Sequence, residues 1–423
     1  MLDFKAVRSD PAPVRAALAR RRDGSEERLD RALALDERWR RLETEVGDLR
    51  ARRNAGAAAI GAAKQSGEDA SAAIAEMQEL SPRLKALQTQ HDELGTQLQE
   101  ALASLPNPPD PTAADGDAVL REVGAPRVAT DGVPARDHLE LADGLIDMEA
   151  GARVAGSRFA YLKGDMVLLE LALVRWAIDR LAGHGFEPVI PPVLVREEAL
   201  FGTGFLPDTE QQIYRLADDP LFLAGTSEVA LASLHAGEVL DGSGLPLRYA
   251  GFSPCFRREA GAAGRDTRGI FRVHQFDKVE MFSFVEPTAA VDEHERLLGI
   301  EEEILQALEI PYRVVNISVD DLGSSAVKKY DCEAWMPSQG RYREVTSTSN
   351  TTDFQSRRLD IRFRPAGSSG RPRHVATLNG TAVTWRHMIA LLENGQREDG
   401  SVVLPEVLQA WGAPQMLRVG DWT

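Results

Sequence analysis

The chain has 423 residues, enough for two or three domains with a sizeable apolar core. It carries 49 basic and 65 acidic residues, a net charge of −16, which argues against non-specific attraction to nucleic acid. Two cysteines, Cys255 and Cys332, are too few for a disulfide framework or a cysteine-based zinc site. We therefore expect a cytoplasmic protein that contacts any RNA through local basic patches.

The N-terminal segment and the longest apolar run give no indication of export or membrane insertion. The N-terminus, MLDFKAVRSDP, lacks the basic-then-apolar order of a secretion signal. The run MVLLELALVRWAI is interrupted by Glu170 and Arg175 and is too short to span a bilayer. We expect no membrane partner.

The first hundred residues carry two apolar stripes whose members recur in alternating steps of three and four. A period of 3.5 residues is typical of a coiled-coil seam, so we expect two long helices folded back as an antiparallel hairpin. The turn is expected within AAKQSGEDAS, and arms of about 35 residues would each reach roughly 50 Å. The stripes are Ala32, Leu35, Trp39, Leu42, Val46, Leu49, Arg53, Gly56 and Ile60, then Leu80, Leu84, Leu87, His91, Leu94, Leu98, Ala101 and Leu105.

Such a hairpin commonly serves for dimerisation or as a spacer between domains, and that interpretation stays open. One feature favours a nucleic-acid partner, because the segment 50–64, near the far end, has four basic residues and no acidic one. Cations at that end would be well placed to meet phosphates. They are Arg50, Arg52, Arg53 and Lys64.

A proline-rich stretch, LPNPPDPTAADGD, ends the hairpin, because proline cannot continue a helix. It divides the chain into residues 1–107 and 108–423. In the second part short alternating strands mix with helices, without a regular βαβ rhythm, a GxGxxG motif or a P-loop. This pattern favours an α+β fold on an antiparallel sheet. Residues 166–186 are expected to form a helix that ends at Gly183 or Gly185, followed by an extended edge segment, EPVIPPVLV.

The segments CFRRE and IFRVHQFDKVEMF are expected to be paired strands joined by a loop rich in glycine, alanine and charge. Alternate side chains of a strand share a face. Guanidinium groups match phosphate oxygens and an aromatic ring stacks on a base, so we predict a nucleotide site over which the loop could close. A solvated face laced by ion pairs is the alternative. The predicted face holds Cys255, Arg257 and Glu259 from one strand and Arg272, His274, Phe276, Lys278 and Glu280 from the other, with Arg265, Asp266 and Arg268 in the loop.

Three further short segments carry hydroxyl, amide or carboxylate groups, each expected in an extended strand. Together they predict a pocket for a small molecule with an amine and a hydroxyl, beside a polyphosphate. His274 and His387 lie near these segments, and we expect them to be packed or hydrogen-bonded, because no ligand spacing supports zinc. The polar residues are Thr226 and Glu228 in LAGTSEV, Glu344 and Ser347 in REVTSTSN, and Asn379, Thr381 and Arg386 in TLNGTAVTWR.

At this point the sequence resembles the seryl-tRNA synthetases of bacterial type, a family of class II aminoacyl-tRNA synthetases. The similarity covers essentially the whole chain in the right order. The segments that carry it are HGFEPVIPPVLV, similar to motif 1, CFRREAGAAGRDTRGIFRVHQFDKVEM, similar to motif 2, TLNGTAVTWRHMIALLEN, similar to motif 3, and VAGSRFAYLKGD, GTGFLPDTEQQIY, GTSEVAL and REVTSTSNTTDFQSRR.

The resemblance implies a tRNA-binding helical arm, residues 1–107, and a class II catalytic domain, residues 108–423, built on an antiparallel sheet flanked by helices. The implied reaction is activation of L-serine by ATP, with Mg²⁺, and transfer to the 3′ end of serine tRNA. Selenocysteine tRNA is a further candidate acceptor. Residues 26–104 would bind the tRNA, the HGFEPVIPP region would form a homodimer, and neither DNA nor zinc is implied.

The resemblance also implies roles for individual residues. Arg257 would hold the α-phosphate and the serine carboxylate, Glu259 the adenine amino group, and Phe276 the adenine ring. Arg272 and Arg386 would hold the outer phosphates. The remaining implied residues are Glu344 and Ser347 for Mg²⁺, Arg258, Val273, Val345 and Thr346 for ATP, and Thr226, Ser227, Glu228, Glu280, Asn379 and Thr381 for serine. The catalytic residues among them would be Arg257, Glu344 and Arg386.

The chain departs from the family's usual pattern in two places. Trp385 precedes the motif 3 arginine where many relatives have a small residue, which could alter packing under the ATP site. GTSEV replaces the common PTAEV but keeps Thr226 and Glu228. The competing hypotheses are a synthetase-like ligase that loads a carrier protein, a non-catalytic binding protein, and a duplicated copy with a role in resistance or regulation.

Overall fold

The computed structural model describes residues 1–127, 135–207, 210–260, 266 and 268–417. The chain forms two compact units, Leu2–Leu105 and Pro106–Thr423, with Met1 grouped with the second. Much of the loop predicted to close over a nucleotide, including Arg265, lies outside the described residues.

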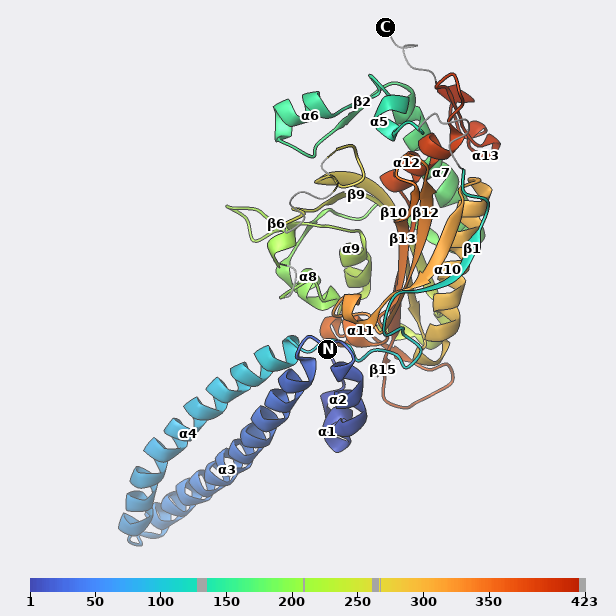
Figure 1. Cartoon of the computed structure of the whole chain (residues 1–423). Helices are drawn as coiled ribbons and strands as arrows, with labels where there is room; N and C mark the ends of the chain where they lie inside the picture. The colour runs from blue at the N-terminus through green and yellow to red at the C-terminus, as the bar shows by residue number, and fades with distance from the viewer. Residues whose placement is uncertain (128–134, 208–209, 261–265, 267, 418–423) are drawn as a thin grey trace. The chain divides into compact units, whose positions relative to one another are not determined.

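The first unit is helical, and two of its helices are the long antiparallel pair that the sequence predicts (Figure 1). The chain reverses between Gly67 and Ala70, within the predicted turn. The helices of this unit are α1 (Phe4–Ser9), α2 (Pro11–Ala19), α3 (Ser25–Ser66) and α4 (Ser71–Ala103).

The seam between α3 and α4 is apolar where the 3.5-residue period predicts it. Val46 and Leu49 of α3 pack with Leu80 and Leu84 of α4. Towards the turn Met77 packs against Gly56, which has no side chain, since a Cβ at Gly56 would come within 2.6 Å of the Met77 sulfur. Towards the other end of α4 one detail of the prediction is wrong, because Leu102 is buried and Ala101 only half-buried.

The second unit is built on an eight-stranded sheet in which every neighbouring pair is antiparallel except the edge pair β4–β9 (Figure 1). The α+β class with a mainly antiparallel sheet is therefore confirmed. In spatial order the strands are β1 (Ala118–Val123), β11 (Tyr312–Asn316), β12 (Lys328–Met336), β13 (Arg341–Asn350), β16 (Ala376–Thr384), β10 (Gln275–Val285), β9 (Leu247–Phe256) and β4 (Glu187–Val189).

Helices cover both faces of this sheet. One face packs against α7 and α10 around a large apolar core that includes Val279 and Met281, both fully buried. On the other face α9 packs on β9 and β10, and α11 packs on β16. The helices are α5 (His138–Leu141), α6 (Met148–Ala155), α7 (Asp165–Gly183), α8 (Glu197–Thr203), α9 (Glu228–Ala232), α10 (Ala290–Ala307), α11 (Phe354–Leu359), α12 (Trp385–Gly395) and α13 (Glu406–Gln409).

Short strands and single-turn 3₁₀ helices complete the unit. The small sheets are β15 (Arg373–His374), β14 (Arg362–Arg364) and β8 (Val239–Asp241); β5 (Leu194–Val195), β7 (Phe222–Leu223) and β6 (Tyr214–Arg215); β2 (Ile146–Asp147) and β3 (Tyr161–Leu162); and β17 (Val402–Val403) and β18 (Met416–Leu417). The 3₁₀ helices are Glu210–Gln212, Ser233–His235, Gly242–Gly244, Pro287–Ala289 and Val319–Asp321.

The predicted helix before the edge segment is α7, which ends at Gly183, and the edge segment contains β4. None of the helices in the described part of the chain combines the length and apolarity needed to cross a membrane.

The paired strands CFRRE and IFRVHQFDKVEMF are shorter than predicted. β9 ends at Phe256 and β10 begins at Gln275, so Arg257–Glu259 and Ile270–His274 lie outside the ladder. Glu259 has a positive φ of 49°, which turns the chain away from the sheet. One further backbone bond, from the Arg257 N–H to the His274 carbonyl at 3.0 Å, keeps the two ends together.

Candidate functional site

The centre of β10 carries polar side chains towards the face covered by α9. Phe276, Lys278 and Glu280 alternate along the strand and therefore point the same way. On β9 they lie opposite Cys255, Ser253 and Gly251 respectively. Lys278 and Glu280 are buried and form an ion pair.

Two β-bulges bring further polar groups to this face. On β16 the register shifts so that Ala382 is the extra residue and Thr381 lies opposite Glu280. On β13 the extra residue is Val345. Because of that bulge, Glu344 and Ser347 share one face although they are three residues apart, an odd separation that would put them on opposite faces of a regular strand.

The segment Thr226–Glu228 closes one end of the polar face. It was predicted as a strand, and this prediction is wrong, because Glu228 is the first residue of the short helix α9. The Thr226 hydroxyl accepts a hydrogen bond from the Glu228 backbone N–H at 3.2 Å, which starts that helix. Lys278 Nζ donates to the same hydroxyl at 2.7 Å, so the segment still meets the centre of β10.

Glu228 and Glu280 place two buried carboxyl groups near each other. Glu228 Oε1 accepts hydrogen bonds from Gln355 Nε2 at 2.8 Å and from Asn379 Nδ2 at 3.0 Å. Burial, reinforced by the Glu280 charge, raises the pKa of Glu228 from 4.5 to about 7. Burial also raises the pKa of Glu280, although Lys278 and Arg257 oppose the rise. A cation bound beside these two carboxyl groups would lower both of the raised pKa values.

Arg257 and Phe276 lie together next to this carboxyl pair. The guanidinium carbon of Arg257 is 5.3 Å from the centroid of the Phe276 ring. Arg257 Nε donates to the Gly225 carbonyl at 3.1 Å, which fixes the guanidinium beside the Thr226 segment. The neighbouring Arg258 side chain is exposed. The pair offers an anion-binding group and a flat ring at one place.

The other predicted arginines are each paired with a carboxylate. Arg272 donates to Glu259 at 2.5 Å. Arg386 lies 3.1 Å from both the backbone oxygen and the Oε1 of Glu344. The Phe271 ring contacts Arg386 and Arg343 through cation–π geometry, with centroid distances of 4.7 and 3.8 Å. Arg272 and Arg386, the two arginines that were predicted to hold the outer phosphates of a nucleotide, are thus each held by a carboxylate.

Glu344 and Ser347 have a third neighbour that the sequence analysis missed. Asp331 of β12 is the direct cross-strand partner of Ser347, and its side chain is buried. Burial, together with the Glu344 charge, raises the pKa of Asp331 to about 7, while the Lys329 ammonium, 3.7 Å from Oδ2, and a hydrogen bond with Ser347 oppose the rise. Asp331 Oδ1 has no hydrogen-bond partner among the described residues.

These oxygen donors fit a magnesium ion. Mg²⁺ in nucleotide sites is usually held by one or two carboxylates together with substrate phosphates and water. The described residues contain no group of three or more His, Cys, Asp or Glu side chains that could hold a metal by themselves. The unpaired oxygen of Asp331 is the observation in favour, because a buried carboxylate oxygen without a donor attracts a cation.

Some predicted site residues do not turn their side chains towards the polar face. Val273 and Val345 belong to the apolar core on the other side of the sheet. The Thr346 hydroxyl donates to Glu301 of α10 at 2.8 Å, also away from the polar face. A ligand on the polar face could meet these three residues only through their backbones.

Several contributors to the site were not assigned a role from sequence. Lys278 was placed on the polar face but given no role, although its alternation with Phe276 and Glu280 was the available signal. Gln355 lies on α11, within the segment REVTSTSNTTDFQSRR that carries the resemblance, but it was given no role of its own. His274 and His387 are hydrogen-bonded to backbone groups, at 2.9 and 3.1 Å, as predicted.

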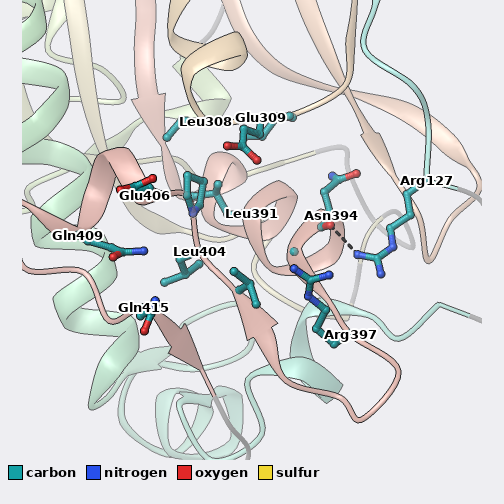
Figure 2. Close-up of a pocket in the computed structure, with 14 residues that line it drawn as sticks. Arg127, Leu308, Glu309, Leu391, Asn394, Arg397, Leu404, Glu406, Gln409 and Gln415 are labelled. Atoms are coloured by element: carbon teal, nitrogen blue, oxygen red, sulfur yellow. Dashed lines mark hydrogen bonds between the residues drawn. The ribbon is translucent and has the colours of Figure 1, made fainter.

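A cavity of about 540 Å³ lies elsewhere in the second unit (Figure 2). It is bounded by the region around α12 and α13 and by the loop after α10, and none of the predicted site residues lines it. In Figure 2 Arg127 points at Asn394, to whose backbone oxygen it donates a hydrogen bond at 2.8 Å. The side chains of the predicted site therefore lie outside this cavity.

The long helical pair presents the basic residues that were predicted to meet phosphates. Arg52 pairs with Glu76 of the other helix at 2.6 Å, and Arg50 pairs with Gln88. Arg53 contacts the side chain of its neighbour Asn54 at 3.2 Å. The side chains of Arg50, Arg52, Arg53 and Lys64 are all exposed.

Comparison with known proteins identifies both units. Residues 1–109 match the family model described as the seryl-tRNA synthetase N-terminal domain. Residues 213–395 match the model described as the class II tRNA synthetase core domain for G, H, P, S and T. The chain is 49% identical to a serine–tRNA ligase of Thermobifida fusca, over 99% of both chains. It is also 49% identical to one of Streptomyces coelicolor, over 97% of both.

Solved structures give the same result. A crystal structure of seryl-tRNA synthetase from Pyrococcus horikoshii complexed with ATP has a TM-score of 0.92 and 42% identity. It covers 98% of this chain and 99% of that one. A cytoplasmic serine–tRNA ligase of Naegleria fowleri in complex with AMP has a TM-score of 0.84 and 31% identity, covering 97% and 96% of the two chains.

The raised pKa of Glu228 predicts a pH-dependent stability. Between about pH 4.5 and 7 the folded state holds a proton on Glu228 that the unfolded chain has lost, so the free energy of unfolding falls as the pH rises. In Glu228→Gln this contribution is absent. Between pH 4.5 and 7 the free energy of unfolding of the wild type should therefore fall by roughly 3 kcal/mol relative to that of the variant.

Urea denaturation at a series of pH values measures this difference. Glu198→Gln, which changes an exposed glutamate of the same unit, is the control and should follow the wild type. Parallel pH profiles of the wild type and Glu228→Gln would show that the Glu228 carboxyl is not kept neutral by its surroundings.

Proposed function

Because the chain belongs to the seryl-tRNA synthetase family, we infer that it activates L-serine with ATP and transfers the seryl group to the 3′ end of serine tRNA. The observation that carries this inference is the shared polar face of β10, β13 and β16. There Glu280 lies opposite Thr381, beside Glu228 and Arg257. The relatives reported above are named as serine–tRNA ligases, and none supports a carrier-loading or regulatory alternative.

The serine pocket is proposed to lie between α9 and the centre of β10. Glu228, held by Gln355 and Asn379, receives the ammonium group of serine, with Thr226 beside it. Glu280 and Thr381 bind the hydroxyl, and Ser227 completes the wall. Lys278 holds the Glu280 carboxylate in place through their ion pair. A pocket that pairs with a substrate hydroxyl leaves its own polar groups unpaired when alanine enters.

The nucleotide is proposed to lie along the same face next to the serine. Phe276 stacks on the adenine, Glu259 accepts from its amino group, and Arg257 lies between the α-phosphate and the serine carboxylate. Arg272 and Arg386 hold the outer phosphates. Both arginines already contact carboxylates of the site, which sets their position before the nucleotide binds.

In the first step a carboxylate oxygen of serine attacks the α-phosphorus of ATP. The bond from that phosphorus to the bridging oxygen breaks, which gives seryl-adenylate and pyrophosphate. No protein nucleophile is required, since positioning and charge stabilisation supply the catalysis. In the second step the 3′ hydroxyl of the tRNA attacks the seryl carbonyl carbon, and AMP leaves.

A magnesium ion is proposed to be held by Glu344 and Ser347, with Asp331 beside them. When bound, it would neutralise charge on the phosphates. The Asp331 carboxyl, which loses its proton near pH 7, would add negative charge to that position. Arg386 balances Glu344 from the other side.

The helical arm, residues 26–104, is proposed to bind the tRNA, and residues 1–107 and 108–423 are proposed as the two functional domains. A homodimer is proposed through the HGFEPVIPP region. It is supported by exposed apolar side chains on β4's flank and on α7, since Ile190 is 84% exposed and Leu171 is 57% exposed. The cytoplasm, which holds the tRNA and ATP, is the proposed location.

Replacement of Glu280 by alanine should abolish serine activation. The substitution removes the carboxylate opposite Thr381, so serine-dependent ATP–pyrophosphate exchange should fall by about 10³-fold or more. Glu286→Ala, just beyond the end of β10, is the control and should stay within about twofold of the wild type. Wild-type exchange in Glu280→Ala would remove this residue from the serine site.

Deletion of residues 26–104, with a short Gly-Ser link between the ends, should separate the two steps. Adenylate formation should stay within about threefold of the wild type, because the second unit keeps its own core. Aminoacylation of serine tRNA should fall by about 100-fold or more, because the phosphate contacts of the arm are lost. Normal charging by the deleted protein would contradict the tRNA-binding role of the arm.

A further inference from the structure

Glu301 is an ionisable residue buried in the apolar core, and it has no role in the reaction proposed above. It lies on α10, packed against the sheet on the side opposite the polar face, and its exposure is 0%. A carboxyl group in such a place is costly to bury, and an apolar side chain of similar volume would often be at least as stable. Its presence therefore needs an explanation other than packing.

The contacts of Glu301 connect two strands of the sheet. Its Oε2 accepts a hydrogen bond from the Thr346 hydroxyl of β13 at 2.8 Å and lies 3.8 Å from the Cys332 sulfur. Its Oε1 has no hydrogen-bond partner among the described residues and lies 3.1 Å from the place of a Cβ at Gly380 of β16. A hydrogen bond from the backbone N–H of Thr381, the next residue of β16, also lowers the pKa of this carboxyl, against the larger effect of burial.

The two strands separate at the point where Glu301 meets them. β13 and β16 are paired from Asn350 and Leu378 only as far as Thr348 and Gly380. β13 pairs with β12, and β16 with β10, along their whole lengths, and beyond that point each strand has its bulge, at Val345 and Ala382 respectively. The Glu301 carboxyl therefore contacts both strands at the junction where their direct pairing ends.

The residues that follow this junction are those of the proposed site. On β13, Ser347 and Glu344, the proposed magnesium ligands, lie just before Thr348 in the chain. On β16, Thr381, proposed to bind the serine hydroxyl, comes directly after Gly380. Burial raises the pKa of Glu301 well above its usual value, which shows how far the group is held from water. The carboxyl can accept from both strands, from the Thr346 hydroxyl of β13 and from the Thr381 backbone N–H of β16.

We infer that Glu301 is a positioning residue that fixes the separation of β13 and β16, and with it the distance between the phosphate-binding and serine-binding halves of the site. This inference rests on the proposed function. Since adenylate formation requires the serine carboxylate to meet the α-phosphorus, a small change in that separation should lower kcat more than it weakens the binding of either substrate.

The test is serine-dependent ATP–pyrophosphate exchange with full-length Glu301→Gln, Glu301→Met and Gly380→Ala. Gln keeps a neutral donor and acceptor, whereas Met keeps the volume and loses both. Gly380→Ala leaves the carboxyl in place but crowds the same junction, because the new Cβ would lie 3.1 Å from Oε1, 3.1 Å from Met281 Cε and 3.2 Å from Thr348 Oγ1. Ile304→Met, on the same buried stretch of α10, is the matched control for repacking.

We expect kcat to fall by about 10- to 100-fold in Glu301→Met and in Gly380→Ala, with the KM for ATP within about threefold of the wild type. Glu301→Gln and Ile304→Met should keep kcat within about threefold. Circular dichroism and thermal unfolding give the folded fraction, by which each kcat is divided. If Glu301→Met does not fold, Gly380→Ala decides the outcome.

A lowered melting temperature with an unchanged kcat in Glu301→Met and Gly380→Ala would overturn the inference, because the carboxyl would then be only structural. A loss in Glu301→Gln as large as that in Glu301→Met would also overturn it. The wild-type enzyme serves a separate purpose: if it shows no serine-dependent exchange, the proposed function fails before any variant is compared.

Discussion

Lys278, Glu280 and Glu228 are held out of water on one face of the sheet, and this burial constrains everything around them. The ion pair of Lys278 with Glu280, and the amide donors of Gln355 and Asn379 on Glu228, offset part of the cost. What remains appears as raised pKa values of the two carboxyls. A substrate that brings an ammonium group and a hydroxyl would complete the pairing, and this is the role that we propose for serine.

The sheet delivers these groups because it departs from regular pairing at two places. The bulges at Ala382 and Val345 place Thr381 opposite Glu280, and Glu344 beside Ser347. A regular strand would have sent one member of the second pair into the apolar core. Glu301 occupies the junction between the two bulged strands. We therefore propose that the geometry of this polar face depends on α10 behind the sheet as well as on the strands themselves.

Sequence periodicity predicted the parts of the structure that follow a local rule. The 3.5-residue period predicted the seam of α3 and α4, and the alternation of Phe276, Lys278 and Glu280 predicted the polar face of β10. Local rules could not predict that Thr226–Glu228 starts a helix, since a hydroxyl-to-backbone bond decides it. They could not find the bulges or Asp331 either, because cross-strand register is a property of the tertiary fold.

The central claim is that this polar face selects an amino acid by its hydroxyl. ATP–pyrophosphate exchange with serine, alanine, glycine and threonine, comparing kcat/KM values, tests it most directly. We expect the kcat/KM for serine to exceed that for alanine by about 10⁴-fold, because alanine leaves Glu280 and Thr381 without a partner. A kcat/KM for alanine within tenfold of that for serine, or a clear preference for an amino acid without a hydroxyl, would contradict it.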